Sequence, residues 1–363
     1  MFLKNAWYVA AWDTEVRPDA LFTRKILGVQ VLLYRDDDGR VSALEDRCCH
    51  RLAPLSHGQR QGGCVRCMYH GLVFDASGRC VEVPGQDRIS DKLRVRSFPV
   101  VERDHLLWIW MGDAERADPS LIHEAHWHND DSEWKAGRGG YIHYQSNAQL
   151  IADNLLDFSH LAFVHQASIG TRAQAAVKPQ VERLDAAVRI TYITRNTPIA
   201  PFARALSKLP DVTDRFQVYT WNIKGCYFAQ DSVITAPGEG ADTTNPLALR
   251  LHAMIALTPE TDKTSHYFWS SAHSDFNPDL PGITDKLIEH TSAAFQEDRQ
   301  IIEAQQRAID DAPDAAMVGI PADAALMQVR WMLDKLLSEE AASASSSDRP
   351  AQVVLRPIST AAS

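Results

Sequence analysis

The chain has 363 residues, which is long enough for two domains or one large one, and its formal net charge is −10. Its composition of 45% hydrophobic and 23% charged residues is ordinary for a globular protein. The acidic balance argues against nucleic acid as the main partner, because phosphate binding needs a basic surface. A small anionic substrate remains compatible with this charge, since a few local cations are enough to bind it.

The N-terminal segment, MFLKNAWYVAAWDTE, lacks the long apolar stretch and the small-residue cleavage site of a signal peptide. No window approaches the roughly 18 uninterrupted apolar residues of a membrane span, so none is expected. We therefore expect a cytoplasmic location, where thiols stay reduced. Clustered cysteines in such a compartment are more often metal or redox ligands than disulfides.

Short strand-like runs separated by turn signals occupy residues 22–112, for example KILGVQVLLYR followed by DDDGR. They predict a compact all-β domain with cysteine- and histidine-rich loops at one end. The polar, proline-containing segment DAERADPS at 113–120 predicts a domain boundary, and we place the first domain at residues 1–115.

The second part of the chain mixes helical and strand patterns. Residues 141–165 change from alternation to a helical pattern, and strand-like runs between 189 and 273 predict a second, larger sheet. A long helix is expected over about 284–310. We place this second domain at residues 116–340 and predict a flexible C-terminal tail at 341–363, where the sequence becomes small and polar.

The stretch 46–74, DRCCHRLAPLSHGQRQGGCVRCMYHGLVF, holds four of the six cysteines and three of the fourteen histidines. Within it, Cys48-x-His50 is followed after sixteen residues by Cys67-x-x-His70. Two thiolates and two neutral imidazoles on paired loops suit a [2Fe–2S] cluster in which two histidines replace two cysteines on one iron. The alternatives are a disulfide, simply buried cysteines, or a structural zinc built on Cys64-x-x-Cys67 with Cys48, Cys49 or His70.

The patterns CxHRxAPLSxG and CxYHGLxF resemble the Rieske domain of bacterial Rieske non-heme iron oxygenases. The resemblance implies that Cys48 and Cys67 bind one iron and His50 and His70 the other. It also implies that Gly71 permits a tight loop with an aromatic residue near Phe74 beneath it. Three residues are left as bystanders, namely Cys49, Cys64 and His57.

Two departures from the family pattern are visible, because Cys49 and Met68 stand where prolines are common. Adjacent thiols make the choice between Cys48 and Cys49 less certain, although Cys49 has no spacer before His50. Rieske proteins of respiratory chains carry a disulfide between the two loops, at positions that Ala53 and Tyr69 occupy here. Its absence favours the oxygenase branch.

The segment 147–165, predicted to be helical, carries Asn154, Asp157, His160 and His165. Spacing of three places the first three along one side of a helix. His165 would lie about 140° from His160 around an ideal helix, so the helix must distort or end for both imidazoles to reach one ion. The alternative is an amphipathic helix with two incidental histidines.

The predicted helix at 284–310 places Asp298 in the middle of a mostly apolar face, whereas Glu297 and Glu303 point well off it. A carboxylate on a buried face must be paired or bound to metal, and a buried ion pair with an arginine is the alternative. Two histidines and one carboxylate with open positions are typical of non-heme Fe(II) oxygen chemistry. His160, His165 and Asp298 are therefore the candidate iron ligands.

The resemblance extends over nearly the whole chain, through NAWYVAA and DNLLDFSHLAFVH, to the oxygenase components of vanillate O-demethylases and other aryl-methyl oxygenases. It implies an α+β fold with an N-terminal all-β Rieske [2Fe–2S] domain. A helix-grip-like catalytic domain, an antiparallel sheet with helices, then holds a mononuclear Fe(II).

The implied activity is O₂-dependent monooxygenation of a methyl group on an aromatic substrate, expected to bear a carboxylate or sulfonate. The outcome is O-demethylation or aryl-methyl hydroxylation. Ring dihydroxylation or N-demethylation by the same iron is the alternative within the family. A zinc-binding protein or an electron carrier without oxygenase activity is the alternative outside it.

The family also implies a partner arrangement. Asp157 would bridge a cluster histidine of the neighbouring subunit to an iron-bound histidine, in a head-to-tail homotrimer where His70 meets Asp157 of the next chain; Asn154 would join this network. A helix-terminal or solvated acid is the alternative for Asp157.

Because no dinucleotide-binding motif is present, electrons from NAD(P)H are expected through a separate reductase, alone or with a ferredoxin. An acidic carrier could be steered by four arginines, Arg47, Arg51, Arg60 and Arg66, although such residues are more often solvated surface.

Overall fold

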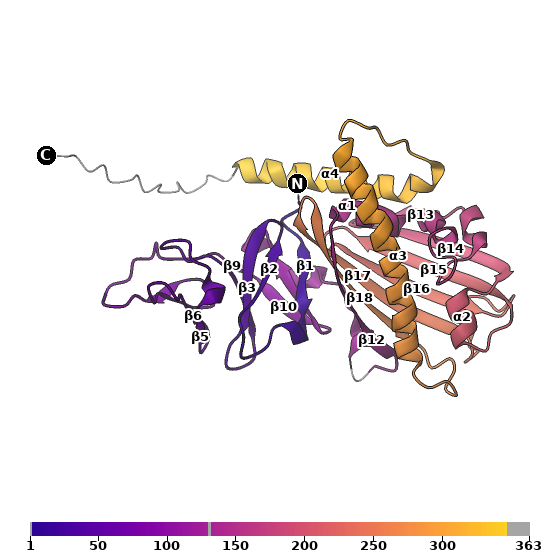
Figure 1. Ribbon diagram of the computed structural model, residues 1–363, viewed down its shortest axis with the longest axis horizontal. Coiled ribbons are helices and arrows are strands. Elements are labelled where there is room, and N and C mark those ends of the chain that lie inside the picture. The colour runs from indigo at the N-terminus through magenta and orange to yellow at the C-terminus, as the bar shows by residue number, and fades with distance from the viewer. Residues whose placement is uncertain (1, 130–131, 347–363) are drawn as a thin grey trace.

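A computed structural model describes residues 2–129 and 132–346 of the chain. The molecule is elongated, with the loops around β5 and β6 at one end and a large sheet with helix α3 at the other (Figure 1). Within the described residues, no helix is both long and apolar enough to cross a membrane.

The N-terminal part is all-β, as expected. Leu27 and Gly28 both adopt positive φ (49° and 80°) in the two-residue turn between β2 and β3, the geometry of a tight hairpin whose twist matches its strands. One sheet has the order β1-β11-β10 and another the order β2-β3-β4-β9. The strands are β1 Trp7–Trp12, β2 Phe22–Ile26, β3 Val29–Arg35, β4 Val41–Glu45, β9 Ser97–Phe98, β10 Val100–Arg103 and β11 Leu106–Trp110.

A third small sheet, β5-β6-β7-β8, carries the loops that were expected to bind the cluster. Phe74 is fully buried and packs in one apolar cluster with Cys48 and Cys67, so an aromatic residue does lie beneath the loops. The strands are β5 Gln59–Gln61, β6 Cys64–Arg66, β7 Val73–Phe74 and β8 Cys80–Glu82.

The second part is built on a seven-stranded antiparallel sheet of order β12-β18-β17-β16-β15-β14-β13, which confirms the predicted larger sheet. Its strands pair consecutively by hairpins except for β12, which closes against β18. The bounds are β12 Lys135–Tyr144, β13 Gln180–Arg183, β14 Ala187–Pro198, β15 Val212–Asn222, β16 Tyr227–Thr235, β17 Leu249–Thr261 and β18 Thr264–His273.

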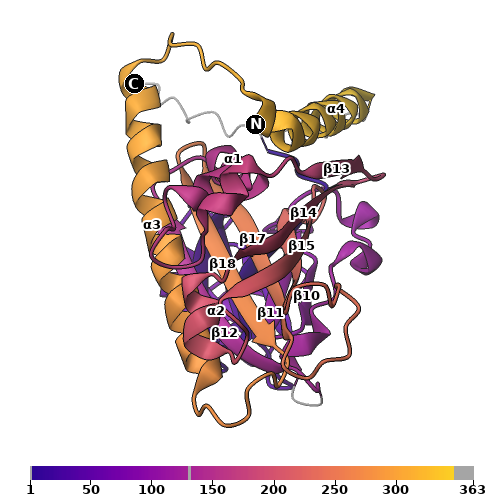
Figure 2. The same ribbon diagram turned by 90° about the vertical axis from the view of Figure 1, so that its right-hand side faces the viewer.

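Helix α3 (Ile283–Asp311) runs along one side of this sheet, next to α1 (Ala148–Leu156) and α2 (Pro201–Leu206) (Figure 2). Its bounds confirm the predicted helix to within one residue at each end. Gly137 of β12 permits the close approach of α3, because a Cβ at this position would lie 2.7 Å from Cγ1 of Ile288.

Helix α4 (Ala324–Ser346) was not anticipated. Its Leu333 and Leu336 contact the apolar cores of both parts of the chain, and Glu340 accepts hydrogen bonds from the backbone N–H of Asn5 at 2.6 Å and of Lys4 at 2.9 Å. The first six residues of the expected tail, 341–346, therefore continue this helix, and the rest of the expected tail lies outside the described residues.

The segment 147–165 is not one helix, contrary to the pattern expected from its sequence. Helix α1 ends at Leu156, Asp157 is extended (φ −119°, ψ 102°), and a 3₁₀ helix, η6 (Phe158–Ala162), follows. The carboxylate of Asp157 accepts hydrogen bonds from the backbone N–H of Ser159 (2.8 Å) and from its hydroxyl (3.0 Å), so this side chain caps the new helix instead of allowing α1 to continue. The expectation that the helix must end for His160 and His165 to converge is confirmed.

The remaining regular elements are short 3₁₀ helices in connecting segments. They are η1 Asp13–Glu15, η2 Leu55–His57, η3 Ala114–Arg116, η4 Pro119–Leu121, η5 His126–His128, η7 Arg172–Ala176 and η8 Pro321–Asp323.

Candidate metal centre and active site

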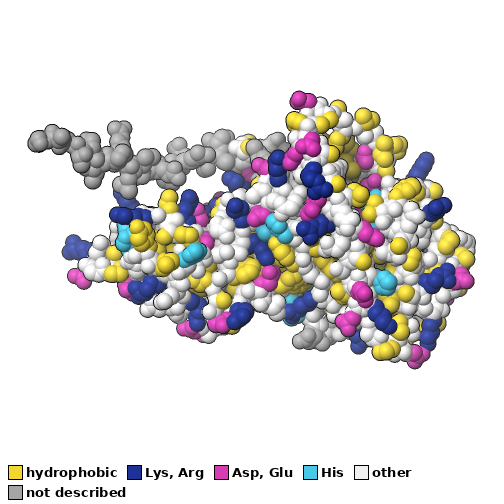
Figure 3. Space-filling model, viewed as in Figure 1, with side chains coloured by type: hydrophobic (Ala, Val, Ile, Leu, Met, Phe, Trp, Pro, Cys, Tyr) yellow, Lys and Arg dark blue, Asp and Glu magenta, His cyan; other side chains and the backbone are white. Residues whose placement is uncertain are grey.

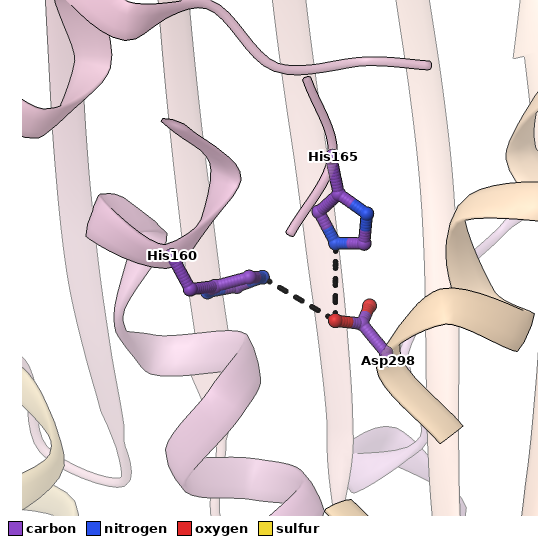
Figure 4. A group of neighbouring side chains, drawn as sticks. All are labelled: His160, His165 and Asp298. Atoms are coloured by element: carbon purple, nitrogen blue, oxygen red, sulfur yellow. Dashed lines mark hydrogen bonds and ion pairs between the residues drawn. The ribbon is translucent and has the colours of Figure 1, made fainter. Parts of the chain in front are cut away.

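Three side chains from two distant segments converge beside α3. His160 lies on η6, His165 on the following loop and Asp298 on α3 (Figure 4). Oδ1 of Asp298 is 3.0 Å from Nε2 of His165 and 3.5 Å from Nε2 of His160. All three ligand atoms lie within 4.8 Å of one another, a spacing that one metal ion can bridge.

The other ring nitrogen of each histidine is already engaged. Nδ1 of His160 donates to the backbone carbonyl of Asp157, and Nδ1 of His165 donates to Oε2 of Glu297 at 2.7 Å. Hydrogen bonds at Nδ1 fix the tautomer that leaves the Nε2 lone pair free. The donor set, two Nε2 atoms and one carboxylate, therefore fits a mononuclear iron.

At each of the two imidazoles, burial lowers the pKa and nearby carboxylates raise it. Burial lowers the pKa of His160, against the attraction of Asp298. Burial also acts to lower the pKa of His165, but the hydrogen bonds and charges of Asp298 and Glu297 outweigh it and the pKa is raised. With a metal bound, His165 would serve as a neutral ligand through Nε2, and Nδ1 would still donate to Glu297.

The loop after η6 folds tightly back on itself. The N–H groups of Ser168 and Gly170 both donate to the carbonyl of His165, at 3.1 and 2.9 Å. A Cβ at position 170 would lie 1.9 Å from the carbonyl oxygen of Leu161, so only glycine fits where the loop crosses η6. This close crossing positions His165 over α3.

The structure brings Asn154 to the same centre, since its Nδ2 donates to Oδ1 of Asp298 at 3.1 Å. Asp157 contributes its carbonyl to His160, while its half-buried carboxylate bonds to Ser159 instead of the triad. Among the described residues, no arginine pairs with Asp298, so the alternative of a buried ion pair with an arginine is not the arrangement found.

Glu297 was missed by the sequence analysis. It points off the apolar face of α3, as expected, but the loop bearing His165 covers this flank of the helix. Oε2 of Glu297 also accepts from the hydroxyl of Ser168 at 3.0 Å. The only sequence signal was its position beside Asp298.

The triad opens onto a cavity of about 90 Å³. The wall comes from α1, α2, α3, η6 and strands β15 to β18. Its aromatic residues are Phe158, Phe202, Tyr219, Phe228 and Phe295, and its polar residues include Arg215, Gln230 and Ser271. An apolar cavity with a few placed polar groups suits an aromatic molecule.

The two cysteine–histidine loops have matching backbones. The N–H of Cys48 donates to the carbonyl of Ala53 and that of Cys67 to Leu72, both at 2.8 Å. The residues four positions after each cysteine, Leu52 and Gly71, donate back to the cysteine carbonyls and have φ of 60° and 74°. Each loop therefore carries one cysteine and one histidine in the same backbone frame, with His50 two residues after Cys48 and His70 three residues after Cys67.

The cysteines of these loops are buried and the histidines are exposed. Cys48 and Cys67 are each 2% exposed, and their thiols contact one another. The rings of His50 and His70 are exposed, with centroids 4.6 Å apart. Buried thiolates and outer imidazoles fit a cluster whose two irons differ in ligand type. The three bystanders lie around them, with Cys49 and Cys64 half-buried and His57 exposed.

Histidine and hydrophobic side chains lie side by side at this end of the molecule (Figure 3). Leu52 and Met68 are each 63% exposed, and Tyr69 packs against His70 with ring centroids 4.0 Å apart. The arginines near the cluster loops are largely neutralised. Three of them form ion pairs, namely Arg47 with Glu45, Arg60 with Asp37 and Arg66 with Glu82.

Comparisons with known proteins agree with this geometry. Residues 6–99 match the Rieske [2Fe-2S] domain, and residues 144–339 match the vanillate O-demethylase oxygenase C-terminal domain. The chain is 46% identical to the iron-sulfur subunit of the toluene-4-sulfonate monooxygenase system of Comamonas testosteroni, over 94% of this chain and 98% of that one. It is 36% identical to the oxygenase component of dicamba O-demethylase of Stenotrophomonas maltophilia, over 94% and 99% of the two chains.

Solved structures show the same fold. Dicamba monooxygenase bound to dicamba matches with a TM-score of 0.84 and 33% identity, over 94% of this chain and 99% of that one. A second structure of that enzyme, with a TM-score of 0.76 and 32% identity over the same shares, holds non-heme iron. The expected fold class and the two expected cofactors, a Rieske [2Fe–2S] cluster and a mononuclear iron, are thereby confirmed. The chain belongs to the Rieske oxygenases with a catalytic domain of the vanillate O-demethylase type, and it is the oxygenase component of a monooxygenase system.

Proposed function

We propose that this oxygenase inserts one oxygen atom into a methyl group of an aromatic acid, giving O-demethylation or aryl-methyl hydroxylation. The observation that carries the proposal is the convergence of His160, His165 and Asp298 at the wall of an aromatic-lined cavity. Relatives named for toluene-4-sulfonate, vanillate and dicamba support a substrate that combines an aromatic ring with an acidic group.

In this proposal, His160, His165 and Asp298 hold Fe(II), and Asn154 orients the Asp298 carboxylate. The cluster is bound by Cys48, His50, Cys67 and His70. Bound iron supplies the activation of O₂, which protein side chains alone cannot supply. The aromatic wall excludes water and holds the methyl group toward the triad. One oxygen atom enters the methyl group and the other leaves as water, with two electrons and two protons consumed. A hydroxylated methyl ether then collapses to a phenol and formaldehyde, whereas a hydroxylated aryl-methyl group is a stable alcohol.

The deciding experiment supplies the holoenzyme with NADH, a generic reductase and a panel of methoxy- and methyl-substituted aromatic acids. We expect formaldehyde or a benzylic alcohol in proportion to the O₂ consumed. A ring diol, or formaldehyde from an N-methyl substrate alone, would assign the enzyme to ring dihydroxylation or N-demethylation instead. Stoichiometric zinc in a colourless protein would contradict the whole proposal.

We propose that the working form is a head-to-tail homotrimer. The cluster loops lie around β5 and β6 at one end of the molecule, whereas α1 and α3, beside which the triad lies, belong to the other part (Figure 1), so a neighbouring chain would offer the shorter electron path. Both surfaces carry exposed apolar side chains, including Met68 beside the cluster loops and Phe163, 69% exposed, in the loop beside the triad. In this arrangement Asp157 connects His70 of the preceding chain to His160.

This assembly is tested by light-scattering mass and by Asp157→Asn. We expect a trimer that keeps both metals while coupled product formation falls roughly tenfold or more. A fully active monomer, or unchanged coupled turnover in an iron-loaded Asp157→Asn variant, would contradict the arrangement.

We also propose that electrons come from NAD(P)H through a separate reductase, with or without a ferredoxin, and that the protein works in the cytoplasm. All six cysteines are unpaired thiols, which suits a reducing compartment. Reconstitution with candidate reductases encoded in the source genome, together with cell fractionation, tests both statements. Activity that needs no second protein, or recovery only from a secreted fraction, would overturn them.

A further inference from the structure

A buried cation lines the cavity without an acidic partner. Arg215, on β15, is 7% exposed. Its Nη1 donates to the backbone carbonyl of Ile169 at 3.1 Å, and its Cζ lies 5.7 Å from the ring centroid of Phe202. Across the described part of the chain, Nε has no hydrogen-bond partner and no carboxylate forms an ion pair with this guanidinium.

The neighbouring acid in sequence does not neutralise this charge. Asp214 points to the opposite face of β15, as alternation along a strand requires. Its carboxylate instead accepts from the backbone N–H of Asn196 at 2.8 Å and of Gly238 at 3.0 Å. The side chain of Arg195 approaches the same carboxylate at 3.5 Å, so Asp214 already has a cation outside the cavity.

An unpaired buried guanidinium is costly, because it loses its hydration without gaining a counter-ion. Burial lowers the pKa of Arg215, although arginine remains protonated in practice. A side chain of this kind is stabilised by an anion that enters the cavity. A planar or tetrahedral oxyanion is the best match, since it can accept two parallel hydrogen bonds from one guanidinium.

The cation and the triad line the same cavity. The ring of Phe158 stacks on Tyr219 with centroids 4.0 Å apart and lies 6.4 Å from the ring of His160, so Tyr219 marks the metal end. Arg215 precedes Tyr219 by four residues on the same face of β15, a Cα separation of about 14 Å. Because Arg215 and the triad line one cavity, an aromatic acid bound there can contact both.

We propose that Arg215 binds the carboxylate or sulfonate of the substrate and thereby directs the opposite end of its ring, which bears the methyl group, toward the triad. This inference rests on the proposed function for the identity of the reacting group. It adds a specificity-determining residue to the site and predicts that the site selects aromatic anions.

The competing explanation is that Arg215 only braces the fold, through Ile169 and Phe202. A bracing residue affects every ligand of the cavity alike, because it acts through the shape of the wall. An anion-binding residue discriminates between a charged ligand and a neutral ligand of the same shape. Binding must therefore be measured with matched pairs of probes, in the absence of turnover.

The experiment uses anaerobic calorimetry on the holoenzyme without reductase. The probes are 4-methylbenzenesulfonate and 4-methoxybenzoate, each paired with its neutral amide. We expect the wild type to prefer at least one anion over its amide by about tenfold or more. Arg215→Met should weaken anion binding by roughly 30- to 1000-fold and amide binding by less than about threefold.

Two further variants complete the test. Arg215→Lys keeps the charge but loses the planar guanidinium, so we expect an intermediate loss of affinity for the anion and no loss for the amide. If Arg215→Met does not fold, the result with Arg215→Lys tests the inference. Arg195→Met removes a cation from the neighbouring strand, outside the cavity, and should change neither affinity. Equal weakening of anion and amide, no anion preference in the wild type, or no binding of any probe would overturn the inference.

The two proposals fail separately. An anion preference that depends on Arg215, without hydroxylated product from any member of the substrate panel, would refute the proposed function and leave the anion site standing. Product formation by an enzyme that binds anions and amides equally would refute the anion site and leave the proposed function standing.

Discussion

Glu297 and Asp298, consecutive residues of α3, contact opposite nitrogens of the same imidazole. Oε2 of Glu297 is 2.7 Å from Nδ1 of His165, and Oδ1 of Asp298 is 3.0 Å from its Nε2. Two carboxylates of one rigid helix thus fix the ring on both sides. Of the two, Asp298 is the candidate ligand and Glu297 holds the ring in orientation.

Replacing Glu297 should therefore loosen the iron without removing a ligand. We expect Glu297→Ala to weaken Fe(II) binding by roughly 10- to 100-fold, the usual effect of losing a partner of a metal-bound histidine. Iron retained after dialysis against graded chelator measures this effect. Glu289→Gln, an exposed position on the same helix, is the matched control, and equal iron retention in the two variants would show that Glu297 plays no such part.

Removing one iron ligand should empty the mononuclear iron site and leave the cluster intact. In His160→Ala and in Asp298→Ala we expect loss of the mononuclear iron and of product formation, with the visible absorption and reduced-state EPR of the cluster unchanged. The reason is distance, since the triad and the cluster loops lie in different parts of the chain (Figure 1). Product formation that survives in either variant would assign the oxygenase chemistry to another site.

Substitution of the adjacent cysteines at positions 48 and 49 tests which of the two thiols binds the cluster. Cys48 is 2% exposed and its thiol contacts those of both Cys49 and Cys67, whereas Cys49 is half-buried and its backbone makes none of the hydrogen bonds shared by the two loops. Cys48→Ser should abolish the cluster absorption, and Cys49→Ser should preserve it with iron and sulfide content intact. The reverse pattern would make Cys49 the ligand.

Acid should destabilise the protein through buried histidines, of which His128 is the clearest. Burial lowers the pKa of His128 to about 4, against an attraction from Asp104, while His105 and Arg138 lower it further. The unfolded chain takes up a proton near pH 6.5 and the folded chain does not. This residue's contribution to stability is therefore complete above about pH 6.5 and is lost as the pH falls toward 4, at up to about 1.4 kcal/mol per pH unit.

The measurement compares thermal midpoints at pH 6.5 and pH 5 in the wild type and in His128→Gln. The variant should lose less stability across this interval, by about 2 kcal/mol. Exposed His126, two residues earlier, supplies the control variant His126→Gln. An identical decline in the wild type and in His128→Gln would show that His128 does not titrate on unfolding.

Residues whose role depends on local spacing could be found from the sequence. The two cysteine–histidine pairs fall in short loops, and Asp298 lies on a regular helix whose apolar periodicity gives its direction. The sequence also indicated that a regular helix cannot bring His160 and His165 together. The position at which helix α1 ends depends on the carboxylate of Asp157, which accepts a hydrogen bond from the backbone of Ser159. Such a local side-chain contact competes with the tendency of the backbone to continue the helix.

Residues whose role depends on tertiary packing could not be found in this way. Glu297 acquires its partner only because a loop from another part of the chain folds over α3. Arg215 is an ordinary charged residue of a strand until the cavity around it is known. Helix α4 is stabilised by contacts with two separate cores, which its own sequence does not reveal.

The irregular segment that follows Asp157 has a consequence for how this chain tolerates change. Loops usually accept insertions and deletions, because little depends on their length. Here Val164 donates to the carbonyl of His160 at 2.9 Å, Gly170 donates to that of His165 at 2.9 Å, and position 170 has no room for a side chain. One inserted or deleted residue between the two histidines would turn an imidazole away from α3. Leu161 and Ala162 within this stretch are also buried, so both its length and its buried side chains are constrained.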